Sequence, residues 1–123
     1  MRRLAAIVAL LALTGCSKEV FVKLTKVDGS LVIELSEKAI FGTKPPCVTA
    51  ITVSAYDHQF RGFVWRTSTP NDANCHRRRV FRYGEQIDLF QTDGEAQPLQ
   101  AGMRYRVHVF STGGGSGSAR IKF

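Results

Sequence analysis

The sequence has few of the residue patterns on which enzymes depend. It contains no Gly-x-Ser-x-Gly nucleophile motif and no histidine–glutamate metal motif, and its 10 acidic residues are scattered. The three histidines, His58, His76 and His108, are widely separated along the chain. Residues 113–117 are glycine-rich, but they lack the lysine and following hydroxyl of a phosphate-binding loop and favour a flexible hairpin tip. We therefore expect neither catalysis nor a cofactor.

The apolar run near the N-terminus is too short to cross a membrane. Leu4–Leu13 contains ten apolar residues and no charge, whereas a helix that spans a bilayer needs about 20. Two positive charges, Arg2 and Arg3, precede the run. This arrangement is typical of a secretory signal peptide.

The run ends in Leu13-Thr14-Gly15-Cys16, which resembles the lipobox of bacterial lipoprotein precursors. The resemblance implies that residues 1–15 are a cleaved signal peptide. It also implies that Cys16 carries acyl chains such as palmitate on a membrane facing the periplasm. Residues 16–19 then form only a short tether, and Ser17 favours the outer membrane over the inner membrane by the enterobacterial sorting rule. A chance cysteine, or an ordinary signal peptide that ends here, is the alternative.

Acidic residues are also scarce relative to basic ones. The chain has 17 lysines and arginines, of which 15 remain without Arg2 and Arg3, against 10 acidic residues. A basic surface indicates an acidic partner, such as lipid phosphate, lipopolysaccharide, an anionic glycan or an acidic protein. A periplasmic location argues against nucleic acid.

Cysteine occurs only three times, and lipidation of Cys16 leaves Cys47 and Cys75. Two thiols in an oxidising compartment most simply form a disulfide. Its loop closure would stabilise the domain by about 3 to 4 kcal/mol on the chain-entropy model. The alternative is a metal site formed by both cysteines and His76, but this spacing matches no recognised ligand pattern.

Helical periodicity is missing, and alternation of period two runs through the chain. Asp28-Gly29 is a favoured hairpin turn, and Phe63 and Trp65 are expected to share one strand face. The expected strands lie at residues 20–25, 31–35, 51–56, 63–65, 80–83, 87–90, 103–111 and 118–123. Together they predict an all-β fold over residues 20–123, an antiparallel immunoglobulin-like β-sandwich of seven or eight strands after an N-terminal signal helix.

Two local resemblances accompany this pattern. Residues Leu99, Gly102, Tyr105, Val107 and Val109 resemble the tyrosine corner of fibronectin type III and immunoglobulin-like domains, which implies that the Tyr105 hydroxyl bonds back to the backbone. The C-terminal third is similar to small, poorly characterised lipoproteins of Gram-negative bacteria, which supply no mechanism. The motifs that carry this similarity are Tyr83-Gly84, Pro98-Leu99, Gly102, Tyr105 and the glycine-rich hairpin.

Basic side chains gather in two places. Alternation places Arg104, Arg106 and His108 on the solvent face of one strand, and Arg120 and Lys122 on the solvent face of the last. If these strands pair, the five groups share one face. A second cluster comprises Arg77, Arg78 and Arg79, between His76 and Arg82. Either cluster could bind a partner, or it could simply be solvated and protect a sheet edge from aggregation.

These observations predict a lipid-anchored, non-enzymatic envelope protein that binds another envelope protein, as an accessory, inhibitor or immunity-type subunit. The alternative is a surface module that binds anionic glycan or lipopolysaccharide through the basic strand face. An enzyme is not expected, because the sequence offers no nucleophile–base pair and no metal-ligand set.

Overall fold

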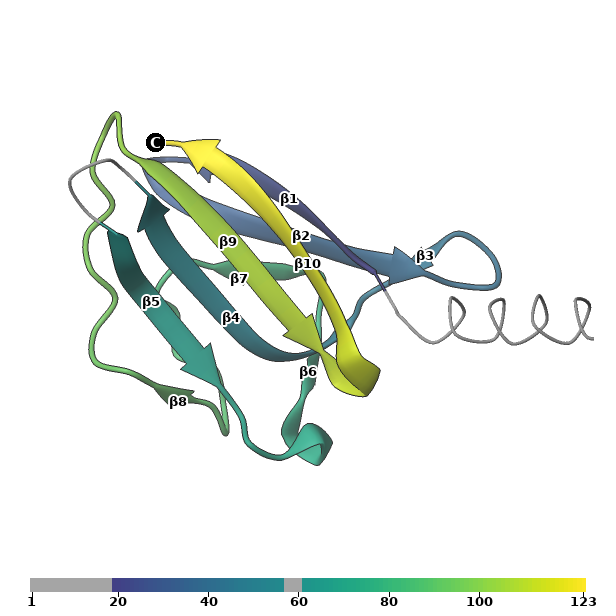
Figure 1. Cartoon of the computed structure of the whole chain (residues 1–123). Helices are drawn as coiled ribbons and strands as arrows, with labels where there is room; N and C mark the ends of the chain where they lie inside the picture. The colour runs from purple at the N-terminus through teal and green to yellow at the C-terminus, as the bar shows by residue number, and fades with distance from the viewer. Residues whose placement is uncertain (1–18, 57–60) are drawn as a thin grey trace, which may run out of the picture.

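The protein is a β-sandwich of two antiparallel sheets, seen in a computed structural model that describes residues 19–56 and 61–123 (Figure 1). One sheet contains β1 (Val20–Val27), β2 (Ser30–Lys38), β3 (Thr43–Lys44) and β7 (Val80–Arg82). The other contains β4 (Cys47–Tyr56), β5 (Arg61–Ser68), β6 (His76–Arg77), β8 (Gln91–Thr92), β9 (Arg104–Ser111) and β10 (Gly115–Lys122). Two short 3-10 turns, η1 (Asp72–Asn74) and η2 (Thr112–Gly114), complete the elements. The predicted signal peptide, Cys16 and Ser17 lie outside the described residues.

The strand order confirms the predicted fold class. Strands β1, β2 and β7 pair in one sheet, and β10, β9, β4 and β5 pair in the other, which is the arrangement of immunoglobulin-like sandwiches. The described residues form ten strands rather than seven or eight, because three of them, β3, β6 and β8, are only two residues long. Within the described ranges, no helix has the length and apolar character needed to cross a membrane.

Alternating side chains account for the pairing of β1 with β2. Inward-facing Leu31, Ile33 and Leu35 are buried, while the residues between them are more exposed. The two strands are joined at Asp28 and Gly29, which both have positive φ, 49° and 80°. A two-residue turn of this conformation matches the twist of paired strands, as the sequence predicted.

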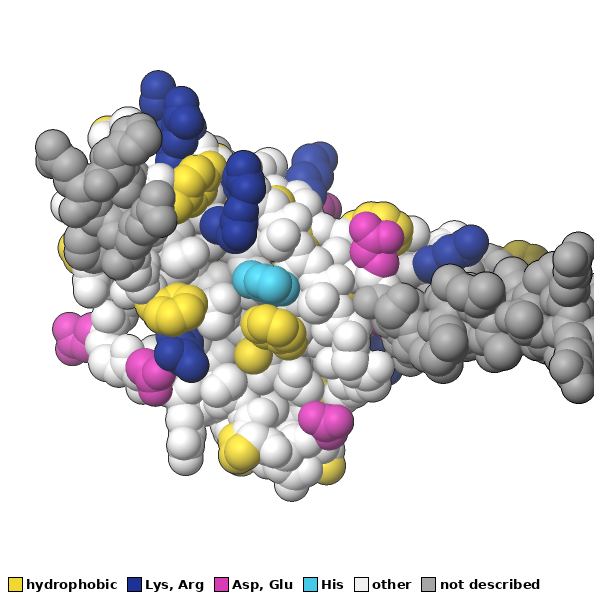
Figure 2. Space-filling model, in the orientation of Figure 1, with side chains coloured by type: hydrophobic (Ala, Val, Ile, Leu, Met, Phe, Trp, Pro, Cys, Tyr) yellow, Lys and Arg dark blue, Asp and Glu magenta, His cyan; other side chains and the backbone are white. Residues whose placement is uncertain are grey.

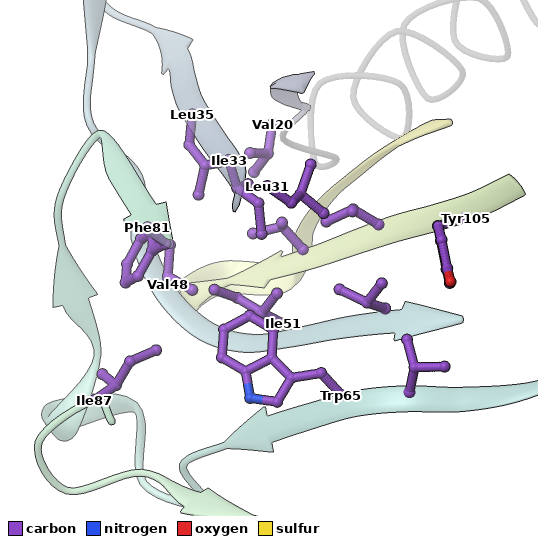
Figure 3. Packing of buried hydrophobic residues seen from close by; sticks show 14 of the residues in the cluster. Val20, Leu31, Ile33, Leu35, Val48, Ile51, Trp65, Phe81, Ile87 and Tyr105 are labelled. Carbon is purple, nitrogen blue, oxygen red and sulfur yellow. The ribbon is translucent and has the colours of Figure 1, made fainter. Parts of the chain in front are cut away.

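The core lies between the two sheets (Figure 3). Leu31, Ile33 and Phe81 from the smaller sheet meet Val48, Ile51, Val53, Trp65, Tyr105 and Val107 from the larger one. The predicted disulfide is confirmed: Cys47 is bonded to Cys75, with their Cα atoms 5.3 Å apart, and it ties β4 to the segment that follows η1. Since both thiols are in the disulfide, the alternative metal site with His76 is wrong.

Phe63 and Trp65 do not share a face, contrary to the sequence prediction. The register between β4 and β5 shifts, so that Val53 faces Trp65 and Ser54 faces Phe63, with Val64 as the additional residue. This β-bulge turns both Val64 and Trp65 inward and leaves the Phe63 side chain 53% exposed. Strict alternation fails wherever such an extra residue is inserted.

The strand expected at residues 87–90 is a turn. The Phe90 amide donates to the Ile87 carbonyl at 3.1 Å, and Leu89 has a φ of 67°, which is incompatible with a strand. Ile87 and Phe90 are nevertheless buried, because the turn directs both side chains into the core. Apolar spacing alone did not distinguish a core-filling turn from a strand.

The glycine-rich run is only partly a hairpin tip. η2 forms the tip, whereas Gly115, Ser116 and Gly117 belong to β10. A Cβ atom on Gly117 would lie 1.8 Å from the Val20 carbonyl oxygen, so glycine is required where β1 approaches β10. Glu19 and Ser116 form a parallel bridge at the same place, so the two sheets meet along this edge.

Candidate functional site

The outer face of the larger sheet brings together the five basic side chains that the sequence placed on one face. β9 and β10 pair antiparallel, with Arg104 opposite Lys122, Arg106 opposite Arg120 and His108 opposite Ser118. The inward neighbours on β9 (Tyr105, Val107 and Val109) are buried, so Arg104, Arg106 and His108 project outward. The predicted pairing and facing are therefore confirmed, whereas binding by these residues stays a prediction.

The same face also carries aromatic side chains that sequence reasoning did not connect with it. β4 lies between β9 and β5, and its register places Ser54 between Arg106 and Phe63, and Ala50 beside Phe110. Phe63 is 53% exposed and Phe110 is 39% exposed. We call the whole surface the outer basic face, and it comprises Tyr56, Phe63, Arg66, Arg104, Arg106, His108, Phe110, Arg120 and Lys122. Figure 2 views it, with Lys and Arg side chains interspersed among hydrophobic ones.

Cations lie against the aromatic rings of this face. The Arg66 guanidinium is 4.7 Å from the centre of the Phe63 ring, and the Arg120 guanidinium is 5.5 Å from that of Tyr56. The His108 imidazole stacks on Phe110, with ring centres 4.5 Å apart and planes within 10°. These contacts hold rigid planar groups at the surface and keep the rings accessible from one side.

Positive charge on the outer basic face has almost no internal compensation. Of the cations on this face, only Arg66 has an ion-pair partner within the described residues, with its Nε atom 3.6 Å from an Asp93 carboxylate oxygen. Arg104, Arg106, Arg120 and Lys122 form no salt bridge with any side chain in the described ranges. Arginines and lysines opposite one another across a ladder repel. The face therefore carries a strong positive electrostatic potential.

A shallow hollow of about 450 Å³ lies within this face. Ser54, Tyr56, Gly62, Phe63 and Arg106 line it, so one guanidinium and two aromatic rings border one depression. The bulge that turns Phe63 outward is what creates this wall. A planar or acidic group that projects from a partner would fit such a site better than a flat surface would.

The second basic cluster is engaged within the fold. Arg77 donates to the Pro45 carbonyl at 2.8 Å and lies 3.7 Å from the buried Glu37 carboxylate. Arg79 donates to the Thr43 carbonyl at 3.0 Å, and Arg78 lies 2.6 Å from the Glu85 carboxylate. Arg77 and Arg79 attach β6 and the residues after it to the β2–β3 hairpin, whereas Arg78 pairs with the turn after β7. Their partners are about 30 residues away in sequence or sit in a turn, so no local pattern indicated them.

His76 is also engaged: its Nε2 atom lies 2.9 Å from the Asp88 carbonyl oxygen, and its ring packs edge-on against Phe90. No group of three His, Cys, Asp or Glu side chains in the described ranges is placed to hold a metal ion. His58 lies outside those ranges.

Tyr83 is the one described group with a clearly shifted pKa. Its hydroxyl lies 2.5 Å from the Gln97 carbonyl oxygen and 3.1 Å from that of Val64, and its ring packs edge-on against Trp65. Burial raises the pKa of the Tyr83 phenol from 10.0 to about 12, with a smaller contribution from Tyr105. These contacts tie a loop to β5, which indicates a structural role.

The fold and this surface define the class as a small, disulfide-bonded β-sandwich with an exposed basic and aromatic sheet face. No family model, no curated protein and no solved structure matches this chain.

Proposed function

We propose that this chain is a lipid-anchored, non-enzymatic envelope protein whose outer basic face binds an acidic surface of another protein. The observation that carries the proposal is the pairing of Arg104 with Lys122 and Arg106 with Arg120, beside the exposed rings of Phe63 and Phe110. Such a face is costly without a partner, because like charges oppose each other across the ladder.

The composition of the face supports a protein as the partner. Arginine and aromatic residues are enriched in the centres of protein interfaces, where guanidinium groups bind carboxylates in a bidentate manner and rings bury a large area. Here Arg106 and Phe63 border one hollow, and His108 and Phe110 are stacked beside it. An acidic side chain that enters the hollow would meet both a guanidinium and apolar walls.

Anionic glycan or lipopolysaccharide is the second candidate, supported by the same hollow between Tyr56, Phe63 and Arg106. Sugar rings stack on aromatic faces, and guanidinium groups bind sugar carboxylates or phosphates. Sugar hydroxyls, however, also need acceptors, and guanidinium and ammonium groups only donate. The nine residues of the outer basic face include no carboxylate or carboxamide, and the Asp93 carboxylate beside them is paired with Arg66. This shortage of free acceptors favours an acidic protein.

Affinity capture with the soluble chain 17–123 tests this proposal. Envelope extract is passed over the immobilised protein and washed at low and high salt. We expect one protein to survive the high-salt wash, because an apolar centre keeps it bound after screening weakens the charges. Recovery of only salt-labile glycan or lipid, or of nothing, would contradict the proposal.

Matched charge reversals locate the binding surface. Arg106→Glu changes the outer basic face, whereas Lys23→Glu makes the same charge change on β1, in the other sheet. Arg106→Glu should lower the affinity for the captured partner at least tenfold, which corresponds to about 1.4 kcal/mol or more. Lys23→Glu should leave this affinity unchanged. Equal affinities for both variants would place the interface elsewhere.

The anchor is tested separately by labelling with radioactive palmitate in a bacterial host. The wild-type chain should incorporate label, and Cys16→Ala should incorporate none and should accumulate as the uncleaved precursor. Label on the Cys16→Ala chain would mean that Cys16 is not the lipidated residue.

A further inference from the structure

The turn between β2 and β3 carries the two most exposed large apolar side chains in the described ranges. Ile40 and Phe41 are neighbours in sequence and both are apolar, yet Ile40 is 95% exposed and Phe41 is 92% exposed. The turn is ordered by a hydrogen bond from the Ala39 amide to the Gly42 carbonyl at 3.1 Å, and Gly42 adopts a φ of 70°. The two side chains therefore project beyond the sheet and do not pack against the core.

This turn lies at the same end of the sheet as the start of β1. Val20 pairs with Glu37, and Lys38 pairs with Thr43 immediately before the turn. Figure 1 shows the beginning of β1 beside the β2–β3 hairpin. Cys16 precedes Glu19 by only three residues, which span at most about 10 Å. A lipid on Cys16 would thus hold the turn close to the membrane surface.

We propose that Ile40 and Phe41 insert into the lipid bilayer beside the anchor and fix the orientation of the domain on the membrane. This inference rests on the proposed lipidation of Cys16. The outer side chain of Phe21, 49% exposed and opposite Ser36, adds apolar surface near the same end. Adjacent exposed Ile and Phe side chains gain from transfer into the acyl boundary, as do the apolar faces of interfacial anchors.

The charges around the turn match a bilayer with anionic headgroups. Lys38 is exposed at the base of the turn, and Lys44 follows it on β3. The nearby carboxylate of Glu37 is buried and shared between Lys44, at 3.6 Å, and Arg77, at 3.7 Å. Lysines flanking an apolar tip attract anionic lipid, and here no exposed carboxylate lies within residues 38–44 to oppose them.

Tryptophan fluorescence tests the insertion in the full lipidated protein. Phe41→Trp and, as the matched control, Val27→Trp are reconstituted into vesicles of phosphatidylethanolamine and phosphatidylglycerol that contain brominated lipid. Val27 is 48% exposed at the opposite end of β1, and the native Trp65 is buried in both proteins. We expect several-fold stronger quenching and a shift of emission to shorter wavelength for Phe41→Trp, and no lipid-dependent change for Val27→Trp.

Quenching of Phe41→Trp that does not exceed that of Val27→Trp would overturn the insertion. The mass of the same preparation separates the two proposals. If Cys16 is acylated and Phe41→Trp is not quenched, only the insertion is wrong. If Cys16 carries no acyl chain, the anchor is wrong and the insertion falls with it. Both positions are exposed, so the substitutions should not affect folding, which thermal unfolding of each variant checks.

Discussion

Tyr105 has the largest of the fully buried side chains in the described structure, and its hydroxyl has one identified partner. The Gln100 amide donates to this oxygen at 2.8 Å, five residues upstream, which is the bond that the resemblance to a tyrosine corner implied. The contact fixes the chain as it enters β9. It therefore also sets the position at which Arg104 and Arg106 emerge on the outer basic face.

Removal of this hydroxyl should cost stability. Tyr105→Phe leaves the Gln100 amide without its acceptor, so we expect the free energy of unfolding to fall by about 1 to 3 kcal/mol. Urea unfolding of the two proteins measures the difference. Tyr56→Phe, which alters a tyrosine on the outer basic face, serves as the control and should change little. Equal stabilities of Tyr105→Phe and wild type would mean that the corner bond contributes nothing.

Tyr83 makes stability depend on pH in the alkaline range. Its pKa is about 12 in the folded protein and about 10 in the unfolded chain, so folding favours the protonated phenol. The stability that this group contributes is complete below pH 10 and is lost as the pH rises from 10 to 12. Unfolding free energies measured from pH 9 to 12 should therefore fall more steeply for wild type than for Tyr83→Phe. Parallel curves would show that Tyr83 ionises as easily in the folded state as in the unfolded one.

At the scale of the elements, Gly117 is a position where β10 and β1 approach too closely for a side chain. A Cβ atom there would lie 1.8 Å from the Val20 carbonyl oxygen and 2.8 Å from its carbon, both of them backbone atoms that cannot rotate away. We expect Gly117→Ala to lower the free energy of unfolding by about 1 to 3 kcal/mol, the range of an overpacked site. Ser118→Ala, an exposed neighbour on β10, should be near neutral. If both variants are equally stable, β1 and β10 separate easily at this edge.

The elements also show how far the sequence could predict the fold and the site. Alternation correctly placed Arg104, Arg106 and His108 outward, because their inward neighbours on β9 are all large and apolar. The same reasoning failed at Phe63, because a single extra residue in β5 reverses the face to which every earlier residue of that strand points. A bulge leaves no simple signature in composition.

Contacts between residues far apart in the sequence could not be predicted from it either. Only the sheet order, with β4 between β9 and β5, places Tyr56 on the same surface as Arg106. The sequence offered a partner or solvent as the contact of Arg77 and Arg79, yet their guanidinium groups bind the Pro45 and Thr43 carbonyls. Sequence spacing predicts which way a side chain points from its strand, but not which distant strand lies next to it.

At the scale of the whole molecule, the two proposed surfaces belong to different sheets and perform different tasks. The membrane contact lies on the β2–β3 hairpin, where β1 begins, and the outer basic face lies on β9, β10, β4 and β5. β1 has eight residues and extends about 26 Å, from its first residue beside the β2–β3 hairpin to its last residue beside the turn that leads into β2. At that opposite end the Lys26 ammonium lies 4.3 Å from the centre of the Phe123 ring, next to Lys122. The basic rows of the face therefore reach away from the proposed membrane contact.

This separation predicts that partner binding and membrane docking are independent. Arg106→Glu should lower the affinity for the partner at least tenfold and leave the quenching of Phe41→Trp by lipid unchanged. Ile40→Ser combined with Phe41→Ser should leave the affinity for the partner unchanged. Binding to vesicle-bound protein, measured for wild type, for each variant and for the combination of both, gives the coupling between the two surfaces. A combined effect equal to the sum of the separate effects supports a domain held at one end so that the outer basic face stays open to a protein. A large coupling would mean that the lipid surface itself occupies the outer basic face, and the preferred partner would then be anionic lipid or lipopolysaccharide.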